Sequence, residues 1–482
     1  MVGRGTALWL TGIALHRAFA PTGLIVRLLE MPSLAHPTDA YACLPDLANF
    51  HRLLGIAESD LLRHADATFS LGQEFVGWTG EDAAFLHAYG EAGEPIADLP
   101  FLQFWVKART SGLPVGIDHF TLAAAAARHG RITASVADAG LARGYHLDAV
   151  GYEGLLRRAA AQLGIAVLAD ADPQAQVIDG TVAAVRTSDG RIVQADLFVD
   201  ATGSEGRLMS LLDPAPAYQP STSPCDRMLR ATATALAPLP LYSRIAAHAA
   251  GWLGLLPLGS RTAVVMAYSQ DHLPDEAAAR MLPRLAGVRL GSEVVPTGLA
   301  ERCRVRPWVG NCVAVGPAAC AGDPLDATPL HREQIAIAHL IALLPVDRAH
   351  MVEADIYNEE VTAHQRRVSD YQAAHYRLSA RPEPFWKAAR SCPLSDDLAW
   401  KIELFAARGM IAEYHGESFN ADSWQALLLG HGVFPRSYDP QADRIPDAAV
   451  AARLQQILGR IRSQVAPMVT HEAARAAAMG VG

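Results

Sequence analysis

Hydrophobic residues follow two patterns along this chain. Apolar residues recur at helical spacing in several stretches, including Leu53, Leu54, Leu61 and Leu62 within one predicted helix. Short, wholly apolar runs bounded by Gly, Asp or Pro are typical of buried strands. The predicted helices are 46–66, 122–128, 152–163 and 330–374.

Strand-like runs occupy the regions between and after these helices. Residues 177–185 with 191–193 predict a hairpin around Ser188, Asp189 and Gly190. Further strands are expected at 196–199, at 312–316 and repeatedly within 227–270, and the chain beyond residue 374 is mostly helical with proline breaks. This order predicts an α/β protein with a sheet-rich insertion and a helical C-terminal part.

The first thirty residues contain a glycine-rich turn. Gly3 and Gly5 open a G-x-G-x-x-L pattern that ends at Leu8 and leads into a helical stretch, and a strand ending in the acid Glu30 follows. The spacing is typical of a dinucleotide-binding unit, in which glycines and a helix N-terminus hold a pyrophosphate and the acid binds a ribose. Leu8 stands at the third glycine position, and the first strand is a stub.

Two other interpretations of this segment remain open. Arg4 followed by nine mostly apolar residues, with Ala18-Phe19-Ala20 after them, could be a signal peptide. A glycine-rich turn without any ligand is equally compatible with the pattern.

Composition narrows the class of protein. Of the 482 residues 50% are hydrophobic and 19% are charged, which excludes a disordered chain. The net charge of −9 argues against a nucleic-acid partner. Six Cys without a CxxC pair make a disulfide framework or a Cys-rich zinc site unexpected. No apolar run is long enough for a membrane span, so we expect a cytoplasmic protein without a membrane partner.

The 18 His show no His-Glu-x-x-His or similar ligand spacing, so no metal site is predicted. His146 and Asp148, two residues apart, are interpreted as structural. His331 is expected to pack behind the turn that precedes it.

Several motifs follow one another in a specific order. After the turn at 3–9 the chain contains FSLG at 69–72, FVGW at 75–78, YHLD at 145–148 and FVDATG at 198–203. They are followed by WLGLLP at 252–257, RPWVGNCVAVG at 306–316 and GDPLDATPLH at 322–331. Together these motifs, which extend over nearly the whole chain, resemble the flavin-dependent tryptophan halogenase family.

The resemblance implies an FAD-binding, Rossmann-like α/β body over 1–340, a substrate-side β insertion at about 204–300 and a helical region over 341–482. It implies that FAD is bound noncovalently in its reduced form, supplied by a separate flavin reductase. In the family, O₂ and the reduced flavin give a flavin C4a-hydroperoxide, which oxidises halide, and the hypohalous acid then reaches an indole.

By position in the motifs, the resemblance also implies which residues bind the cofactor. The pyrophosphate is expected at Gly3, Gly5, Thr6 and Ala7, and the ribose at Glu30. The segment 316–330 is expected along the isoalloxazine ring, with the residues Gly316, Asp323, Pro324, Leu325 and Leu330. The catalytic positions of the family correspond to Ser70, Asp326 and Thr328.

Three departures from the family pattern concern halogenation. The Lys of the family's Phe-Lys-Leu-Gly motif is Ser70, which carries no charge and no amine. The family's Glu-Ser-Thr-Gly segment reads Asp326-Ala327-Thr328-Pro329, and Pro329 has no N–H to offer a halide. The second Trp of the family's Trp-x-Trp-x-Ile-Pro motif is Gly254, so the barrier between substrate and flavin is expected to be altered.

These departures predict an FAD-dependent oxygenase for an indole or another electron-rich aromatic, either a small molecule or part of a peptide. An atypical tryptophan or indole halogenase is the first alternative. A non-catalytic homologue that binds flavin or a partner is the second. A homodimer is one expected assembly.

Overall fold

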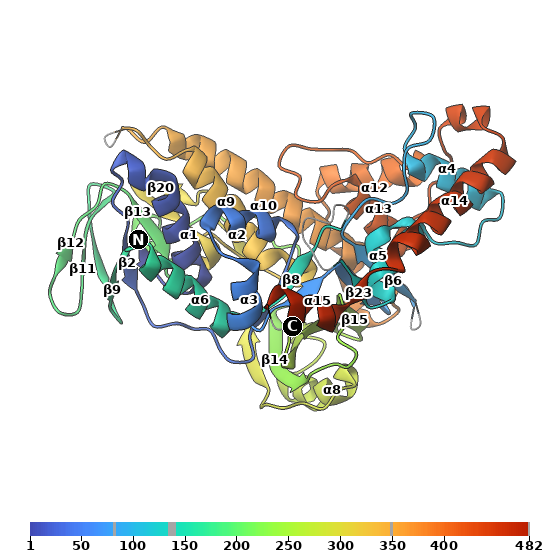
Figure 1. Cartoon of the computed structure of the whole chain (residues 1–482). Coiled ribbons are helices and arrows are strands. Elements are labelled where there is room, and N and C mark those ends of the chain that lie inside the picture. Colours follow the sequence, from blue (N-terminus) through green and yellow to red (C-terminus); the bar gives the residue numbers. More distant parts are fainter. Residues whose placement is uncertain (81–82, 134–140, 348–349, 481–482) are drawn as a thin grey trace. The chain divides into compact units, whose positions relative to one another are not determined.

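The computed structural model describes residues 1–80, 83–133, 141–347 and 350–480 (Figure 1). The chain forms two compact units and passes between them several times. The first unit contains Met1–Ala67, Leu147–Ser223 and Leu299–Val368; the second contains Thr68–His146, Pro224–Gly298 and Ser369–Gly482. These boundaries differ from the predicted division at residue 340, which stays a prediction.

A six-stranded sheet forms the centre of the first unit. Its strand order is β20-β21-β13-β1-β2-β9, and all neighbouring pairs are parallel except β20 with β21. Strand β1 has only two residues, yet it is paired on both sides, so the predicted stub is a central strand. The strands are β20 (Trp308–Val309), β21 (Cys312–Ala314), β13 (Phe198–Ala201), β1 (Val2–Gly3), β2 (Arg27–Glu30) and β9 (Ala166–Ala169).

Helix α1 (Gly5–Phe19) is apolar on nearly all sides and is buried from Thr6 to Leu15. It packs against α6 (Ala149–Gln162) and α9 (Thr328–Ala342). A Cβ on Gly12 would lie 2.9 Å from the Leu28 side chain, so the close approach of helix and strand occurs at Gly12. Leu8 at the third motif position is fully buried and therefore contributes to packing.

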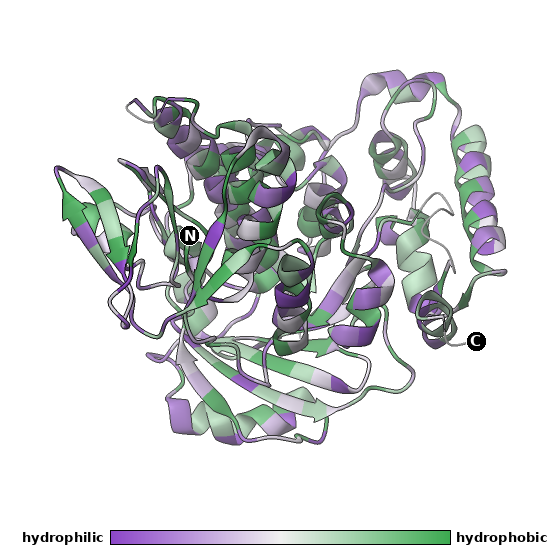
Figure 2. Cartoon of the chain, turned by 60° about the vertical axis from the view of Figure 1, so that its left-hand side comes forward, coloured by the Kyte–Doolittle hydropathy of each residue, from purple (hydrophilic) through white to green (hydrophobic). Residues whose placement is uncertain are grey.

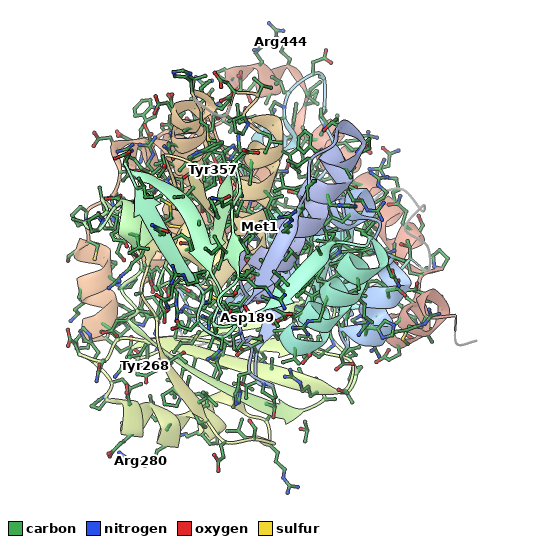
Figure 3. All side chains as sticks on the ribbon, turned by 90° about the vertical axis from the view of Figure 1, so that its left-hand side faces the viewer. Met1, Asp189, Tyr268, Arg280, Tyr357 and Arg444 are labelled. Atoms are coloured by element: carbon green, nitrogen blue, oxygen red, sulfur yellow. A yellow bond between two sulfur atoms is a disulfide. The ribbon has the colours of Figure 1, made fainter. Side chains whose placement is uncertain are left out.

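Three predicted elements are interrupted. The helix expected over 330–374 is two helices, since α9 ends at Ala342 and the next helix, α10 (Glu353–Leu378), begins only at Glu353. The helix expected over 46–66 is two helices, because Gly55 ends the first one with a left-handed backbone (φ 70°). The strand expected over 177–185 is broken at Asp179 and Gly180, which also have positive φ angles. A three-stranded sheet results, and Figure 3 labels Asp189 in its second turn.

The remaining elements of the first unit are short or peripheral. Helix α10 (Glu353–Leu378) begins in this unit and its last ten residues fall in the second unit. The others are β3 (Ala40–Cys43), α2 (Asp46–Leu54), α3 (Glu58–His64), β10 (Gln174–Ile178), β11 (Thr181–Arg186), β12 (Ile192–Val193), α7 (Met209–Leu212), β19 (Arg302–Cys303), β22 (Cys320–Ala321) and the 3-10 helices η1 (Ala20–Thr22), η3 (Gly316–Ala318) and η4 (Leu325–Ala327).

Cys303 of β19 and Cys320 of β22 form a disulfide. The sequence pattern did not predict this pair, because 17 residues separate the two cysteines and neither lies in a CxxC motif. A single disulfide is not a framework of the kind that stabilises small secreted proteins.

A seven-stranded sheet forms the centre of the second unit, and residues 227–298 supply five of its strands, as the predicted insertion requires. Its long strands are mainly hydrophobic (Figure 2), and β16 is buried throughout. In spatial order the strands are β18 (Val295–Gly298), β14 (Arg227–Thr234), β17 (Arg261–Tyr268), β16 (Gly251–Pro257), β15 (Ser243–His248), β5 (Gly72–Val76) and β6 (Ala84–Ala88).

Helices make up most of the remaining second unit, in agreement with the predicted helical C-terminal part. Among the described residues, no helix combines the length and the apolar composition that crossing a membrane requires. The elements are β4 (Thr68–Ser70), α4 (Phe101–Thr110), η2 (Ile117–Phe120), α5 (Leu122–Arg128), β7 (Arg131–Ile132), α8 (Asp275–Ala286), α11 (Pro384–Ser391), α12 (Asp396–Arg408), α13 (Ala421–Gly430), η5 (Pro440–Arg444), α14 (Asp447–Val465), β23 (Val469–Thr470) and α15 (His471–Ala478), with β8 (Gly144–Asp148) at the border of the two units.

Candidate cofactor site and active site

The glycine turn between β1 and α1 has the geometry of an anion site. A Cβ on Gly3 would lie 2.2 Å from the carbonyl oxygen of Ala201, so only glycine lets β1 lie this close to β13. Gly5 begins α1 with φ +66°, and a Cβ there would meet no atom within 4 Å. The first turn of α1 contains no acid. An open helix N-terminus of this kind favours a phosphate group.

A second glycine turn lies against the start of α1. Gly316 has φ +58°, and a Cβ there would lie 2.4 Å from Cβ of Ala7 and 3.2 Å from Oε1 of Glu333. The hydroxyl of Thr6 donates a hydrogen bond of 3.0 Å to that same Oε1. The structure therefore brings Thr6, Ala7 and Gly316, all predicted cofactor residues, into one place.

Glu333 was not predicted from the sequence. It lies on α9, fully enclosed, and burial raises the pKa of its carboxyl group to about 8, while the hydrogen bond from Thr6 acts in the opposite direction. A buried acid that is largely protonated at neutral pH can stand beside a phosphate without repelling it. Glu333 is connected to this turn only because it lies close to Thr6 in space, and the sequence does not give that distance.

Glu30 ends β2 directly beside the glycine turn, since it is the register partner of Gly3. Arg157 from α6 donates from Nε to Oε1 of Glu30 over 3.1 Å and donates a second bond from Nη2 to the same oxygen. The acid is thus at the predicted position, and Arg157 holds one of its oxygens.

The segment after Gly322 forms a tightly bonded turn. Asp323 accepts hydrogen bonds from the Leu325 N–H (3.1 Å) and from the Ser223 hydroxyl (2.9 Å). Both Asp326 and Ala327 have left-handed backbones with φ 61°, which is uncommon for residues other than glycine and typical of functional turns. Pro324, which precedes this turn, is the N-cap of η4, and Leu325 and Leu330 are buried.

Helix α9 begins immediately after this turn. Thr328 is its first residue, and its hydroxyl donates to the carbonyl oxygens of Leu325 (3.0 Å) and Asp323 (3.3 Å). Pro329 follows within the first turn of the helix and has no N–H. The start of α9 therefore offers one N–H donor fewer than an ordinary helix N-terminus.

Ser70 lies in the second unit, at the end of β4, where it pairs with Gly144 of β8. It is 2% exposed, and its hydroxyl donates a hydrogen bond of 3.1 Å to the carbonyl oxygen of Gly72. The guanidinium of Arg143 lies 4.6 Å from the ring centroid of the preceding Phe69. A guanidinium is not a free amine, so Arg143 does not supply the group that a Lys would.

The three lysines of the chain also lie in the second unit. Lys401 is buried and paired with Glu417, and Lys107 donates to two carbonyl oxygens and contacts two carboxylates of the C-terminal region. Lys387 is exposed on α11. Two of the three ammonium groups are thus engaged in other contacts.

Trp252 and Gly254 occupy neighbouring positions on the same face of β16. The Trp252 indole N–H donates to the Tyr376 hydroxyl over 3.0 Å. A Cβ on Gly254 would lie 3.1 Å from Cζ3 of Trp252 and 3.4 Å from Ile245. The space that a second Trp would need is therefore occupied by neighbouring side chains.

The sheet and its glycine turns define a dinucleotide-binding oxidoreductase fold, with the ligand-binding turn at the carboxyl ends of parallel strands. The glycine cradle, the acid-free start of α1 and Glu30 fit FAD. When bound, reduced FAD supplies two electrons to dioxygen.

Comparison with known proteins identifies the family. The family model described as tryptophan halogenase matches residues 1–447. A tryptophan 7-halogenase of Kutzneria sp. (strain 744) is 27% identical, with 97% of this chain and 95% of that protein aligned. A flavin-dependent halogenase from Brevundimonas sp. BAL3 has 29% identity and a TM-score of 0.92, covering 99% of this chain and 98% of its own. Another, from Xanthomonas campestris, has 28% identity and the same TM-score, covering 98% and 96%.

The chain therefore belongs to the tryptophan halogenase family. The predicted fold class is confirmed by these structures, and so is the prediction of an enzyme. Enzymes of this family use reduced FAD supplied by a separate flavin reductase, as the sequence motifs implied.

Proposed function

We propose that this member of the family is an oxygenase that acts on an aromatic substrate. Reduced FAD, O₂ and an aromatic C–H give oxidised FAD, the hydroxylated aromatic and one water molecule. The observation that carries the proposal is the combination of Ser70 and Pro329 at positions where halogenation needs an amine and an amide donor. Family membership and the fit of the first unit to FAD support the flavin part of the reaction.

The start of α9 supports the loss of halide use. A halide needs converging N–H donors to replace its hydration shell, because an uncompensated buried anion is strongly unfavourable. Pro329 removes one donor, and the Thr328 hydroxyl already donates to carbonyl oxygens of the same turn. Asp326 stands where the family has a longer Glu, so its carboxyl group reaches less far from the same backbone position.

The surroundings of Ser70 support the loss of halogen transfer. Its hydroxyl is bound to Gly72, and the nearby buried histidines are neutral at pH 7 because burial lowers the pKa of His146 to about 3 and that of His471 to about 4. Neither a lysine nor a protonated histidine is thus available in β4 and its partners to hold a hypohalous acid.

A cavity of about 210 Å³ in the second unit supports an aromatic substrate. Phe85, Trp105 and Phe434 contribute to its walls, and the Arg109 guanidinium lies 4.1 Å from the Phe434 ring centroid and 5.4 Å from that of Trp105. Two carboxylates, Asp118 and Asp422, also line the cavity, and its aromatic walls are suited to a flat, electron-rich ring.

The test uses the full-length protein with a flavin reductase, FAD, NADH, O₂ and catalase, which removes peroxide from free flavin. Indole, tryptophan and a tryptophan-containing peptide are supplied with chloride and bromide present together. Mass spectrometry should find products heavier by one oxygen atom and no halogen isotope pattern. Product formed equally without the protein, or halogenated product, would contradict the proposal.

An atypical halogenase is the second candidate, because the relatives at 27–29% identity carry halogenase names. Halogenated product in the same assay would support this second candidate. A non-catalytic homologue requires that neither product forms although NADH consumption by the coupled reductase is normal.

A further inference from the structure

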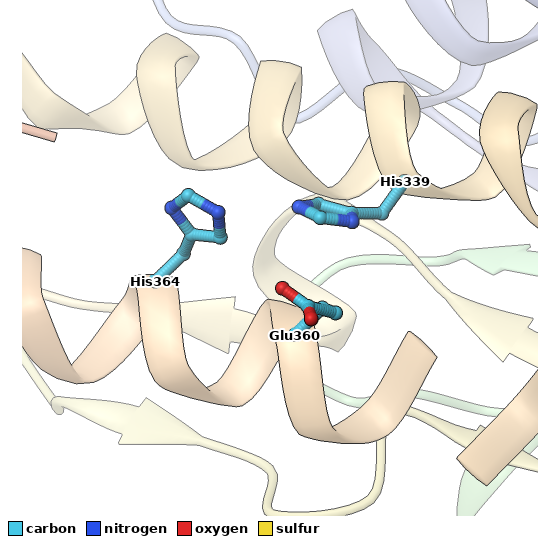
Figure 4. A group of neighbouring side chains, drawn as sticks. All are labelled: His339, Glu360 and His364. Atoms are coloured by element: carbon cyan, nitrogen blue, oxygen red, sulfur yellow. The ribbon is translucent and has the colours of Figure 1, made fainter. Parts of the chain in front are cut away.

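Three potential metal ligands meet between two helices of the first unit. His339 lies near the end of α9, and Glu360 and His364 lie on α10. One ligand atom from each of the three residues lies within 4.8 Å of the other two. Figure 4 shows the three side chains pointing into the space between the helices. All three are half-buried, so that the space is both sheltered and accessible.

The helices themselves create this cluster. Glu360 and His364 are four residues apart and therefore share one face of α10. The Tyr357 hydroxyl donates to the Ala336 carbonyl oxygen over 3.3 Å, which fixes α10 to α9 one helical turn before Glu360.

A second contact lies one residue after His364. The Arg332 guanidinium donates to Oε1 of Gln365 over 2.7 Å. Tyr357 of α10 contacts Ala336 of α9, and the later residue Gln365 of α10 contacts the earlier residue Arg332 of α9. The two helices are therefore antiparallel. These two contacts hold α10 against α9 at positions before Glu360 and after His364.

The ligand chemistry selects a class of metal ion. Two imidazoles and one carboxylate suit Zn²⁺ and similar divalent transition metals, whereas Mg²⁺ and Ca²⁺ prefer oxygen ligands alone. Tetrahedral Zn²⁺ needs each ligand atom at about 2.1 Å, and hence ligand pairs about 3.4 Å apart. Starting from separations of at most 4.8 Å, small side-chain rotations bring the three atoms to that distance.

We propose that His339, Glu360 and His364 form a binding site for one Zn²⁺ ion, with water at the remaining coordination position. The metal connects the end of α9 to α10. Because α9 also carries the Thr328 turn at its other end, the ion stabilises the helix on which the candidate active site depends.

The experiment titrates the chelator-treated, full-length protein with Zn²⁺ in competition with a chromophoric chelator. Co²⁺ substitution reports the coordination through its visible absorption. Two ligand variants, His339→Gln and Glu360→Gln, are compared with two matched controls. His350→Gln changes an exposed histidine of the same unit, and Glu359→Gln changes the exposed neighbour of Glu360.

Wild type and both controls should bind one Zn²⁺ per chain, and each ligand variant should lose about tenfold or more in affinity. Mg²⁺ should not compete. Circular dichroism shows whether each variant is folded. If His339→Gln does not fold, the near-isosteric Glu360→Gln variant still tests the proposal. Failure of wild type to bind Zn²⁺, or equal affinity in ligand variants and controls, would overturn the proposal.

Discussion

The hydroxyl of Thr6 and the carboxyl group of Glu333 are joined by a hydrogen bond of 3.0 Å although 327 residues separate them. This bond connects the first turn of α1 to α9 at the place where Gly316 also touches Ala7. The cofactor turn of the first unit is therefore built jointly by the start of the chain and by the helix that begins at Thr328.

Replacing Glu333 by Gln should change how stability depends on pH. Burial raises the pKa of Glu333 from 4.5 to about 8. Between these values the folded protein keeps the proton and the unfolded chain has released it, so stability falls as pH rises. The slope is about 1.4 kcal/mol per pH unit, and it vanishes below 4.5 and above 8.

Denaturant unfolding at pH 5, 6, 7 and 8 measures this effect. The Glu333→Gln variant should lack the decline attributed to this carboxyl group, while an exposed control, Glu91→Gln, should retain it. Identical slopes in all three proteins would show that Glu333 ionises normally.

Replacing Gly316 by Ala should weaken FAD binding strongly. The new methyl group would lie 2.4 Å from Cβ of Ala7 and would also force a left-handed backbone on alanine. Removing the opposing methyl in Ala7→Gly/Gly316→Ala should recover only part of the affinity, because the backbone strain and the 3.2 Å contact with Oε1 of Glu333 then remain. Flavin fluorescence titration of the four proteins of the cycle gives the coupling energy. Additive effects of the two changes would contradict the contact.

The sequence was sufficient for the parts of this site that are local. Gly3, Gly5 and Glu30 lie within one strand-turn-helix-strand unit, whose spacing follows from backbone geometry alone. The sequence alone did not identify Glu333, because a single acid on a helix has no local sequence signature. His339, Glu360 and His364 were missed for the same reason, since their cluster exists only once α9 and α10 have packed together.

Two of the wrong element boundaries have the same physical cause. Gly55 and the pair Asp179-Gly180 interrupt apolar patterns that continue on both sides of them. A residue with positive φ reverses or ends an element without changing the hydrophobic period, so periodicity alone predicts one helix or strand where there are two.

Breaking the ion pair between Lys401 and Glu417 should destabilise the second unit. Both side chains are largely enclosed, the Lys401 ammonium lies 4.2 Å from the Trp424 ring centroid, and the Trp424 indole N–H donates to the other oxygen of Glu417 over 3.1 Å. The Lys401→Met change retains the apolar stem but leaves a buried carboxylate without its cation. We expect a loss of about 3–5 kcal/mol in unfolding free energy.

The double variant Lys401→Met/Glu417→Gln should recover a substantial part of this loss, because the buried charge is then absent. Urea unfolding measures both values. A loss below about 1 kcal/mol for Lys401→Met, typical of an exposed pair, would show that the pair is solvated.

Restoring halogenation should require changes at Ser70, Asp326 and Pro329 together. Ser70→Lys alone introduces an ammonium group at a site with 2% exposure but leaves the start of α9 without its amide donor. Pro329→Gly restores that N–H, and Asp326→Glu restores the longer acid. We therefore expect halogenated indole from the triple variant Ser70→Lys/Asp326→Glu/Pro329→Gly and none from Ser70→Lys.

The matched control is Ser70→Met/Asp326→Glu/Pro329→Gly, since methionine has a similar length to lysine and no charge. If the ammonium group acts as the positioned acid, the triple variant with lysine should exceed this control by about a hundredfold or more in halogenation rate. Bromide and indole are supplied in excess, and brominated product is quantified by mass spectrometry together with oxygenated product. Equal bromination by the two triple variants would mean that the side chain that replaces Ser70 does not hold the halogen. Bromination by Ser70→Lys alone would mean that the turn at Thr328 binds halide despite Pro329.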